Sequence, residues 1–202
     1  MDDIVLRGMA KWPNVPAVYG WLSLDRRGQW LLKGDRVTNP GIAEFFSRNY
    51  GHDAHGRWFL QNGPQRVFVT LDYTPFVYRI AAATGSALTL TAHTGASTTN
   101  INGAFMDDAG QLLLESDIGI GLVHDTDLEL LIPRFRDATA KAPDEIALAA
   151  AFDALQAGHE SGLLFQTGNG DLPLYPLQAS DAPARFGFVA RPVQPVGEEE
   201  CY

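Results

Sequence analysis

Short runs of alternating apolar and polar residues, separated by glycine-containing turns, dominate the first half of the chain. Asp25-Arg26-Arg27-Gly28 and Gln61-Asn62-Gly63-Pro64 are turn sequences, and each lies between two such runs, so each predicts a β-hairpin. The pattern predicts strands in these stretches: 19–24, 29–32, 57–60, 66–71, 76–81 and 87–92. The first half is therefore expected to be mostly β.

One helix is expected between these strands. Residues 38–41 supply a capping residue and a proline for the first turn, and Gly51 supplies a stop. Ile42, Phe45 and Phe46 then share one face of a short helix.

The second half mixes strands with two helical patterns. Asp125-Thr126-Asp127 is expected to cap a helix that reaches Pro133. Alanine and leucine carry the longest helix from about Pro143 to Gly158. Strands are predicted here at 104–106, 111–115, 118–123, 163–166, 172–177 and 185–190.

Three motifs occur twice. The pattern Asp-x-x-Gly-Gln-x-Leu-Leu begins at Asp25 and again at Asp107. An aromatic residue close to a Gln-x-Gly turn follows in each half, and an Asp-Pro element comes last. The paired segments are 59–63 with 165–168, and 72–75 with 181–183. The chain is therefore expected to hold two divergent copies of one unit.

These patterns predict an α+β fold of two related units, each a mostly antiparallel sheet with one or two helices, packed side by side. A seam between related units is a common place for ligands or partners to bind. The expected segments are a lead-in at 1–19, a first unit at 20–93, a polar linker at 94–102, a second unit at 103–191 and an acidic tail at 192–202.

The first half also resembles a known family. Gly-x-Leu-x-Leu-Asp-x-x-Gly-x-Trp spans residues 20–30, and a proline-led helix then ends in Phe-Phe-Ser at 45–47. Trp-Phe-Leu at 58–60 and Asp-Tyr-Thr-Pro-Phe at 72–76 complete the series. This order resembles the bacterial domain-of-unknown-function family 1285. The resemblance implies a two-domain α+β fold with an internal repeat and a role in signalling through ligand or partner binding. It brings no catalytic residues.

Composition and charge narrow the classes of function. The 202 residues are 46% hydrophobic and carry a formal charge of −9, with one basic spot at Arg26-Arg27, so a nucleic-acid partner is not expected. No apolar run approaches the roughly twenty residues of a bilayer span, and the acidic start lacks the basic residues of a signal peptide. We expect a cytoplasmic protein without membrane association. Cys201 is a poor candidate nucleophile because it stands alone near the end.

His52-Asp53-Ala54-His55 is the cluster that most resembles a metal site, because imidazole and carboxylate are common ligands of zinc. No cysteine lies nearby to complete a structural site. Gly51 and Gly56 flank the cluster and favour a solvated turn. We therefore predict no metal ligand.

Signatures of catalysis are sparse. His124-Asp125-Thr126-Asp127 pairs a general base with a carboxylate, although helix capping is the favoured interpretation of the two aspartates. No serine lies in a Gly-x-Ser-x-Gly elbow. Gly119-Ile120-Gly121 lacks the third glycine of a dinucleotide fingerprint, and no Gly-Lys-Ser loop occurs. No catalytic residue and no cofactor are predicted.

Large aromatic residues are concentrated in the first half, and a minority of them are expected to line a groove at the seam. Trp21, Gln61, Asn62 and Asp72 are the predicted ligand-binding residues. A local explanation also exists for the last three of them, since Gln61 and Asn62 belong to a turn and Asp72 caps the bend before Pro75.

Three functions stay open at this point. The leading hypothesis is a binding or regulatory protein that holds a small molecule or a protein segment at the seam. The second is an enzyme in which His93, His124 and Asp125 meet in a cleft, although we lean against an enzyme. The third is a structural homodimer formed through an apolar patch on the aromatic unit.

Overall fold

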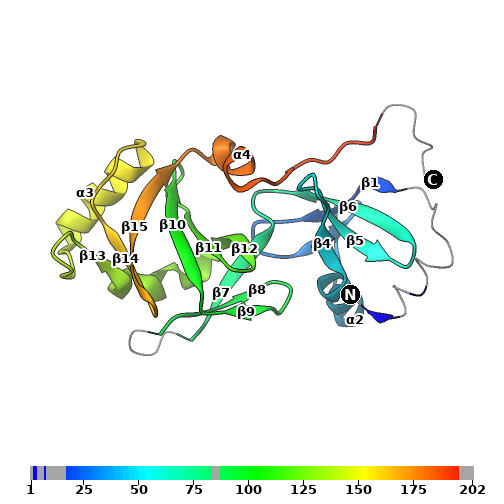
Figure 1. Ribbon diagram of the computed structural model, residues 1–202, viewed down its shortest axis with the longest axis horizontal. Helices are drawn as coiled ribbons and strands as arrows, with labels where there is room; N and C mark the ends of the chain where they lie inside the picture. Colours follow the sequence, from blue (N-terminus) through cyan, green and yellow to red (C-terminus); the bar gives the residue numbers. More distant parts are fainter. Residues whose placement is uncertain (1, 4–6, 8–16, 83–86, 196–202) are drawn as a thin grey trace. The chain divides into compact units, whose positions relative to one another are not determined.

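Two compact units make up the described part of the chain (Figure 1). The computed structural model describes residues 2–3, 7, 17–82 and 87–195. Unit 1 holds the described residues up to Pro75 together with those from Gly187 onwards, and unit 2 holds Phe76–Phe186. The chain therefore leaves unit 1, builds unit 2 and returns. Each unit contains a mostly antiparallel sheet with few helices, which confirms the predicted α+β class.

Unit 1 is built on a six-stranded sheet in the order β3-β2-β1-β6-β5-β4. Neighbouring strands are antiparallel except for β1 and β6, which are parallel. The elements are β1 (Val18–Leu24), β2 (Trp30–Leu32), β3 (Asp35–Arg36), α2 (Pro40–Arg48), β4 (Tyr50–His52), β5 (Trp58–Asn62) and β6 (Gln65–Leu71). Both hairpins predicted for the first half are confirmed.

Unit 2 is built on a nine-stranded sheet in the order β13-β14-β15-β10-β11-β12-β7-β8-β9. The strands are β7 (Phe76–Ala82), β8 (Thr89–Ala92), β9 (Ser97–Thr98), β10 (Ile101–Asp107), β11 (Leu112–Ser116), β12 (Gly119–Val123), β13 (Phe135–Arg136), β14 (Leu164–Thr167) and β15 (Gly170–Leu177). The helices are the 3-10 helices η1 (Asp125–Arg134) and η2 (Ala179–Asp181), and the α-helices α3 (Glu145–Gln156) and α4 (Ala182–Phe186).

The order of strands shows the internal repeat. Taken along the chain, β1 to β6 and β10 to β15 occupy the same places in their sheets, and in each set the first and last strands form the central parallel pair. A helix follows the third strand in both units, α2 in one and η1 in the other. Unit 2 adds α3 between β13 and β14, and β7 to β9 extend its sheet beyond β12.

The repeated Asp-x-x-Gly-Gln motif forms the same tight turn in both units. Oδ1 of Asp25 accepts a hydrogen bond from the backbone N–H of Gln29 at 2.8 Å, and Oδ1 of Asp107 accepts one from Gln111 at 2.7 Å. The glycine of each motif has a positive φ, 74° in one and 75° in the other, a conformation that glycine adopts without steric cost. The motif is therefore a hairpin device.

A second aspartate turn occurs in both units. A turn was predicted after Gly51 in unit 1, but its copy in unit 2 was not predicted. Asp53 accepts a hydrogen bond from the N–H of Arg57 at 3.0 Å, and Asp137 accepts one from Lys141 at 3.1 Å. In both cases the aspartate follows the strand at the far end of the six-strand set. The fourth residue of this turn is glycine in unit 1 but Ala140, with φ of 60°, in unit 2, so no common glycine marks the pair in the sequence.

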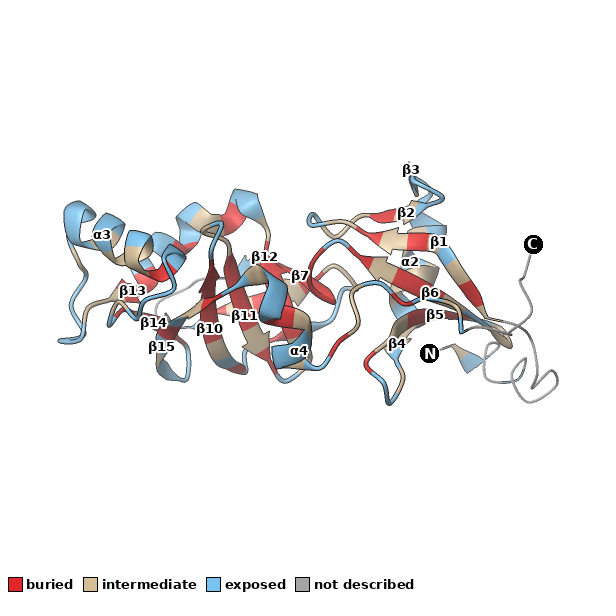
Figure 2. Ribbon diagram, turned by 90° about the horizontal axis from the view of Figure 1, so that it is seen from above, coloured by how far each residue is buried: buried red, intermediate tan, exposed pale blue. Residues whose placement is uncertain are grey.

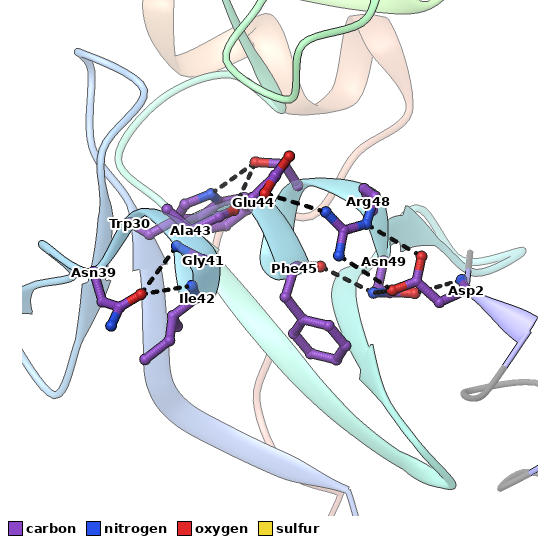
Figure 3. Close-up of polar contacts among 11 residues, drawn as sticks. Asp2, Trp30, Asn39, Gly41, Ile42, Ala43, Glu44, Phe45, Arg48 and Asn49 are labelled. Carbon is purple, nitrogen blue, oxygen red and sulfur yellow. Dashed lines mark hydrogen bonds and ion pairs between the residues drawn. The ribbon is translucent and has the colours of Figure 1, made fainter.

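Helix α2 confirms the predicted capping signals (Figure 3). Oδ1 of Asn39 accepts hydrogen bonds from the N–H groups of Gly41 and Ile42, at 2.9 and 3.2 Å. At the other end, Nδ2 of Asn49 donates to the carbonyl of Phe45 at 2.9 Å. Polar side chains thus satisfy backbone groups at both ends of a short helix.

The end of the second half differs from the prediction. Residues 185–190 were expected to form a strand of the second unit, but α4 ends at Phe186 and the following segment joins unit 1. There Val189 forms a single parallel bridge with Arg57. A side chain on Gly56 would collide with the backbone of Gly187, so this approach needs a glycine.

The boundary between the units also differs from the expected linker. β7 and β8 fall in the predicted first unit, yet β7 pairs in parallel with β12 of unit 2. The expected linker at 94–102 contains β9 and the start of β10. Pairing between strands far apart in sequence leaves no local signal, which explains the difference. The predicted turn at 84–86, and the tail from residue 196, lie outside the described residues.

The apolar residues of unit 2 are buried mainly in the central strands of its sheet, and α3 is largely exposed (Figure 2). Leu155 is the buried residue of α3. Among the helices of the described residues, none is long and apolar enough to cross a membrane.

Candidate ligand pocket in unit 2

An apolar pocket of about 180 Å³ opens in unit 2 among η1, α3 and the turn-side ends of β10 and β11. Hydrophobic side chains form most of its wall, and two polar side chains reach it, Glu129 and Gln156. The hydrophobic side chains are Met106, Leu112, Leu128, Leu131, Ile132, Phe135 and Phe152. A mostly apolar concave site with a few polar groups is the usual form of a small-molecule site.

The aspartate turn between β10 and β11 brings the sheet close to α3. A Cβ atom on Gly110 would lie 3.1 Å from Nε2 of Gln156, which leaves little room for a side chain. Helix α3 packs on β10 and β15 (Figure 1), and Oδ1 of Asp144 caps it by accepting a hydrogen bond from the N–H of Ala147 at 2.8 Å. The motif glycine thus serves both the turn and the pocket wall.

An ion pair with β7 holds the first turn of η1. The guanidinium of Arg79 donates to both carboxylate oxygens of Asp127, at 2.7 and 2.9 Å, and the N–H of Ile80 donates to Oδ2 at 2.9 Å. The hydrogen bond from Arg79 is the main reason why the pKa of Asp127 falls to about 2. Asp127 is buried, and its hydrogen bonds to Arg79 and Ile80 attach η1 to strand β7.

The predicted helix is present, but the prediction that aspartates cap it is corrected. The segment is a 3-10 helix, and His124 is its N-cap, accepting a hydrogen bond from the N–H of Thr126 through Nδ1 at 3.3 Å. Pro133 lies inside it, and proline cannot donate a backbone hydrogen bond. Sequence spacing could not show that Arg79, nearly fifty residues earlier, binds Asp127.

Arg134 holds the other end of η1. Its buried guanidinium donates to the carbonyl of Ala87 at 2.7 Å and to the carbonyl of Gln166 at 3.3 Å. Burial lowers the pKa of Arg134 from its ordinary value. Anchored at both ends, η1 can form a fixed wall of the pocket.

Unit 1 fills the corresponding place with an indole ring. Leu24 pairs with Trp30 across β1 and β2, as Met106 pairs with Leu112 across β10 and β11. The Trp30 ring packs edge-on against Phe46 of α2, with ring centroids 5.9 Å apart. The space between sheet and helix in unit 1 is therefore occupied by a large side chain.

Leucine at position 112 replaces this indole in unit 2. Tyr50 of β4 contacts Trp30 with ring centroids 5.1 Å apart, and its counterpart on β13 is Phe135, which lines the pocket. A smaller side chain at the same register leaves the pocket partly empty. The pocket is thus a point at which the two copies of the repeat differ.

Sequence reasoning missed this pocket although one signal was present. The repeated motif reads Gln-Trp-Leu-Leu from Gln29 but Gln-Leu-Leu-Leu from Gln111, so the variable position marks the site. Only the structure shows that this position points towards α2 in one unit and η1 in the other.

The four predicted ligand-binding residues lie in unit 1 and none lines this pocket. Trp21 is half-buried, with Nζ of Lys33 3.7 Å from its ring centroid. Gln61 is 1% exposed and its Nε2 donates to the carbonyls of Gly63 and Gln65, at 2.8 and 3.3 Å. Within the described part of the chain, its Oε1 has no hydrogen-bond partner. The Gln61 side chain therefore stabilises the turn of the β5–β6 hairpin.

Asn62 and Asp72 are exposed and lie near opposite ends of β6. The N–H of Asp72 donates to the carbonyl of Leu24 at 3.0 Å. Seven residues of strand separate the two ends by about 20 Å. Unit 1 therefore does not gather the four residues into one cluster, and their role in binding stays a prediction.

The candidate metal loop is committed to other contacts. Oδ2 of Asp53 accepts a hydrogen bond from Nε of Arg57 at 2.7 Å, and His52 and His55 are exposed. Burial by itself would raise the pKa of Asp53, but the hydrogen bonds from the backbone and side chain of Arg57 and from the backbone of His55 together outweigh it. The pKa of Asp53 is therefore lowered. Across the residues described, no group of three or more histidine, cysteine or acidic side chains is placed to hold a metal.

The histidines of the enzyme hypothesis occupy different surroundings. His93 is half-buried, with its Nε2 atom inside the protein, and removal of the ring from water lowers its pKa to about 3. Nδ1 of His124 lies 2.9 Å from Oδ1 of Asp125. His93 follows β8 and His124 follows β12, and β7 runs between these strands, so their backbones lie about 10 Å apart. Cys201 lies outside the described residues.

A second hollow of unit 2, of about 580 Å³, lies beside η2 and α4. Its lining includes the charged residues Asp181 and Arg185. The two Asp-Pro elements differ in structure, since the one at 72–75 is a bend and the one at 181–183 passes from η2 into α4. The smaller pocket has the apolar, walled form expected of a ligand site.

The fold belongs to a class of two-unit α+β proteins with an internal repeat. A family model described as a protein of unknown function (DUF2946), under the name DUF2944, matches residues 1–193, and the chain belongs to this family. No match was found among the curated proteins.

Two crystal structures resemble the chain. One is a DUF1285 family protein from Silicibacter pomeroyi DSS-3, with a TM-score of 0.53 and 18% identity over 81% of this chain and 85% of that chain. The other is a DUF1285 family protein from Shewanella baltica OS155, with a TM-score of 0.44 and 17% identity over 58% of this chain and 91% of that chain. The first match confirms the resemblance to family 1285 as a likeness of fold. This likeness does not indicate a function.

Proposed function

We propose that this protein binds a small molecule, and that the apolar part of this molecule enters the pocket of unit 2. The observation that carries the proposal is the exchange of Trp30 for Leu112 at equivalent places of the repeat, which leaves a walled apolar space in unit 2. We infer a binding or regulatory role, with signalling as its context. The cytoplasmic location expected from the sequence is part of this proposal.

The size of the pocket limits the ligand. An apolar cavity of about 150 Å³ holds a benzene molecule, and the pocket measures about 180 Å³. The buried part of the ligand is therefore a single ring or a short chain. Because η1 and α3 both line the pocket, a ligand would contact one helix that differs from its counterpart α2 and one helix that unit 1 lacks.

The test uses neutral probes and two tryptophan variants. Ethylbenzene and 2-phenylethanol are expected to raise the melting temperature of the wild-type protein, because a ligand that binds the folded state stabilises it. Leu112→Trp should abolish this effect by filling the pocket. Leu32→Trp is the matched control, since Leu32 is 43% exposed on β2 and lines no part of the pocket.

The proposal fails if neither probe binds the wild-type protein in calorimetry. It also fails if both probes bind Leu112→Trp as tightly as the wild-type protein. A loss of binding in both tryptophan variants would indicate a general effect on folding. Circular dichroism shows whether the variants are folded.

Self-association is a second candidate, and exposed apolar residues of unit 2 favour it. Ile146 of α3 is 83% exposed, and Leu130 and Ile132 of η1 are 54% and 51% exposed. Large exposed apolar side chains are common at protein interfaces. Light scattering at micromolar concentration tests this candidate: a monomer overturns it, and a dimer that Ile146→Glu dissociates supports it.

A further inference from the structure

The two polar side chains at the pocket are uncommitted. Glu129 is exposed on η1, and Gln156 is the last residue of α3. Within the described residues, neither side chain takes part in a hydrogen bond or ion pair. Asp127, two residues before Glu129, is by contrast bound by Arg79. Glu129 and Gln156 are therefore available to a ligand whose apolar part occupies the pocket.

Among the residues that the structure describes, the pocket lining contains no lysine, arginine or histidine and therefore no positive charge. Arg134 at the end of η1 and Arg136 of β13 bind backbone carbonyls instead. Arg134 donates to the carbonyl of Ala87, and Arg136 donates to the carbonyl of Pro133 at 2.6 Å. A ligand carboxylate or phosphate would thus meet Glu129 without a countercharge.

We propose that the pocket selects amines, namely ligands with a ring or short apolar chain and a protonated amino group. This inference rests on the proposed function and adds the class of ligand. The apolar body contacts the leucine and phenylalanine side chains, and the ammonium group donates hydrogen bonds to the Glu129 carboxylate and to Oε1 of Gln156. An ionised partner makes such hydrogen bonds stronger than those between neutral groups.

Three probes of similar size distinguish the contribution of the apolar ring from that of the charged group. 2-Phenylethylamine, 2-phenylethanol and phenylacetate share the ring and differ in charge. In calorimetry at pH 7, the amine is expected to bind the wild-type protein about tenfold tighter than the alcohol, and phenylacetate is expected to bind most weakly.

Glu129→Gln tests the acceptor. This variant should reduce the affinity for the amine to that for the alcohol, while the affinity for the alcohol stays unchanged because the apolar contacts remain. Glu160→Gln is the control, since Glu160 is exposed in unit 2, lines no part of the pocket, and its loss changes the net charge equally.

Separate outcomes overturn the two proposals. If the alcohol binds as tightly as the amine, or if Glu129→Gln and Glu160→Gln weaken the amine equally, the selection of amines is overturned while the pocket stands. If none of the three probes binds the wild-type protein, the pocket itself is overturned. A tenfold preference that only Glu129→Gln removes supports the inference.

Discussion

Units 1 and 2 share six strands in one topology but use the space above the first hairpin differently. Unit 1 packs Trp30 there against aromatic side chains of α2 and β4. Unit 2 carries Leu112 at the equivalent place, replaces α2 by η1, and adds α3. The comparison shows that two units with the same turn and the same strand register can differ in packing. The space between sheet and helix is filled in one unit and partly open in the other. The filled space stabilises its unit, and the open space is available for binding.

Exchanging the two residues is the strongest way to break this comparison. Trp30→Leu should lower the free energy of unfolding of unit 1 by about 3 kcal/mol, because a buried indole leaves a cavity behind. Leu112→Trp should change the stability of unit 2 by less than about 1 kcal/mol, since the pocket has room. Urea unfolding followed by fluorescence measures both. A larger loss for Leu112→Trp would contradict the assigned equivalence.

The attachment of η1 to β7 has no counterpart in the six-strand set of unit 1. Asp127→Asn should destabilise unit 2 by about 2 kcal/mol, because the guanidinium of Arg79 loses its charged partner. Asp125→Asn, on the exposed side of the same turn, is the matched control. Equal effects of the two changes would mean that the ion pair does not hold η1.

His93 should make the stability of unit 2 depend on pH. The pKa of His93 is about 3 in the folded protein, below its ordinary value of 6.5, so the unfolded chain binds the proton more tightly. Stability from this group is full above pH 6.5 and falls as the pH drops towards 3. The loss at pH 5 should reach about 2 kcal/mol, at 1.4 kcal/mol per pH unit.

His93→Leu is the comparison for this measurement. Denaturant unfolding at pH 7 and pH 5 should show a smaller change for the variant than for the wild-type protein. An equal change would show that other groups cause the acid sensitivity. Asp127 contributes in a lower window, between its ordinary pKa of 3.8 and its folded value of about 2.

The difference between the two aspartate turns is the smallest expected effect. Asp107 is fully buried and Asp25 is half-buried, although their hydrogen bonds are alike. Asp107→Ala should cost about 2 kcal/mol and Asp25→Ala about 1 kcal/mol, because unpaired N–H groups are more costly when buried. Thermal unfolding measures the pair. The reverse order would argue against burial as the cause of the difference.

The pocket shows how far the sequence alone could lead. The repeat, the hairpins, α2 and α3 follow from local patterns, because turns, caps and periodicity act over a few residues. The pairing of β12 with β7, the return of Val189 to Arg57, and the bond from Arg79 to Asp127 join residues far apart in the chain. Such contacts leave no local mark. Aromatic composition favoured unit 1 as the binding unit, whereas the pocket lies where an aromatic residue is missing.

By itself, the sequence determined that this is an α+β protein with a duplicated unit, since the two aspartate motifs specify the same turn and the same register. Only the tertiary structure decided how the core next to that turn is packed in each unit. Whether position 30 or 112 lies in a filled core or beside an open pocket depends on the size of its side chain together with the helix that packs against it. Packing between distant segments, not the local preference of any residue, sets that outcome.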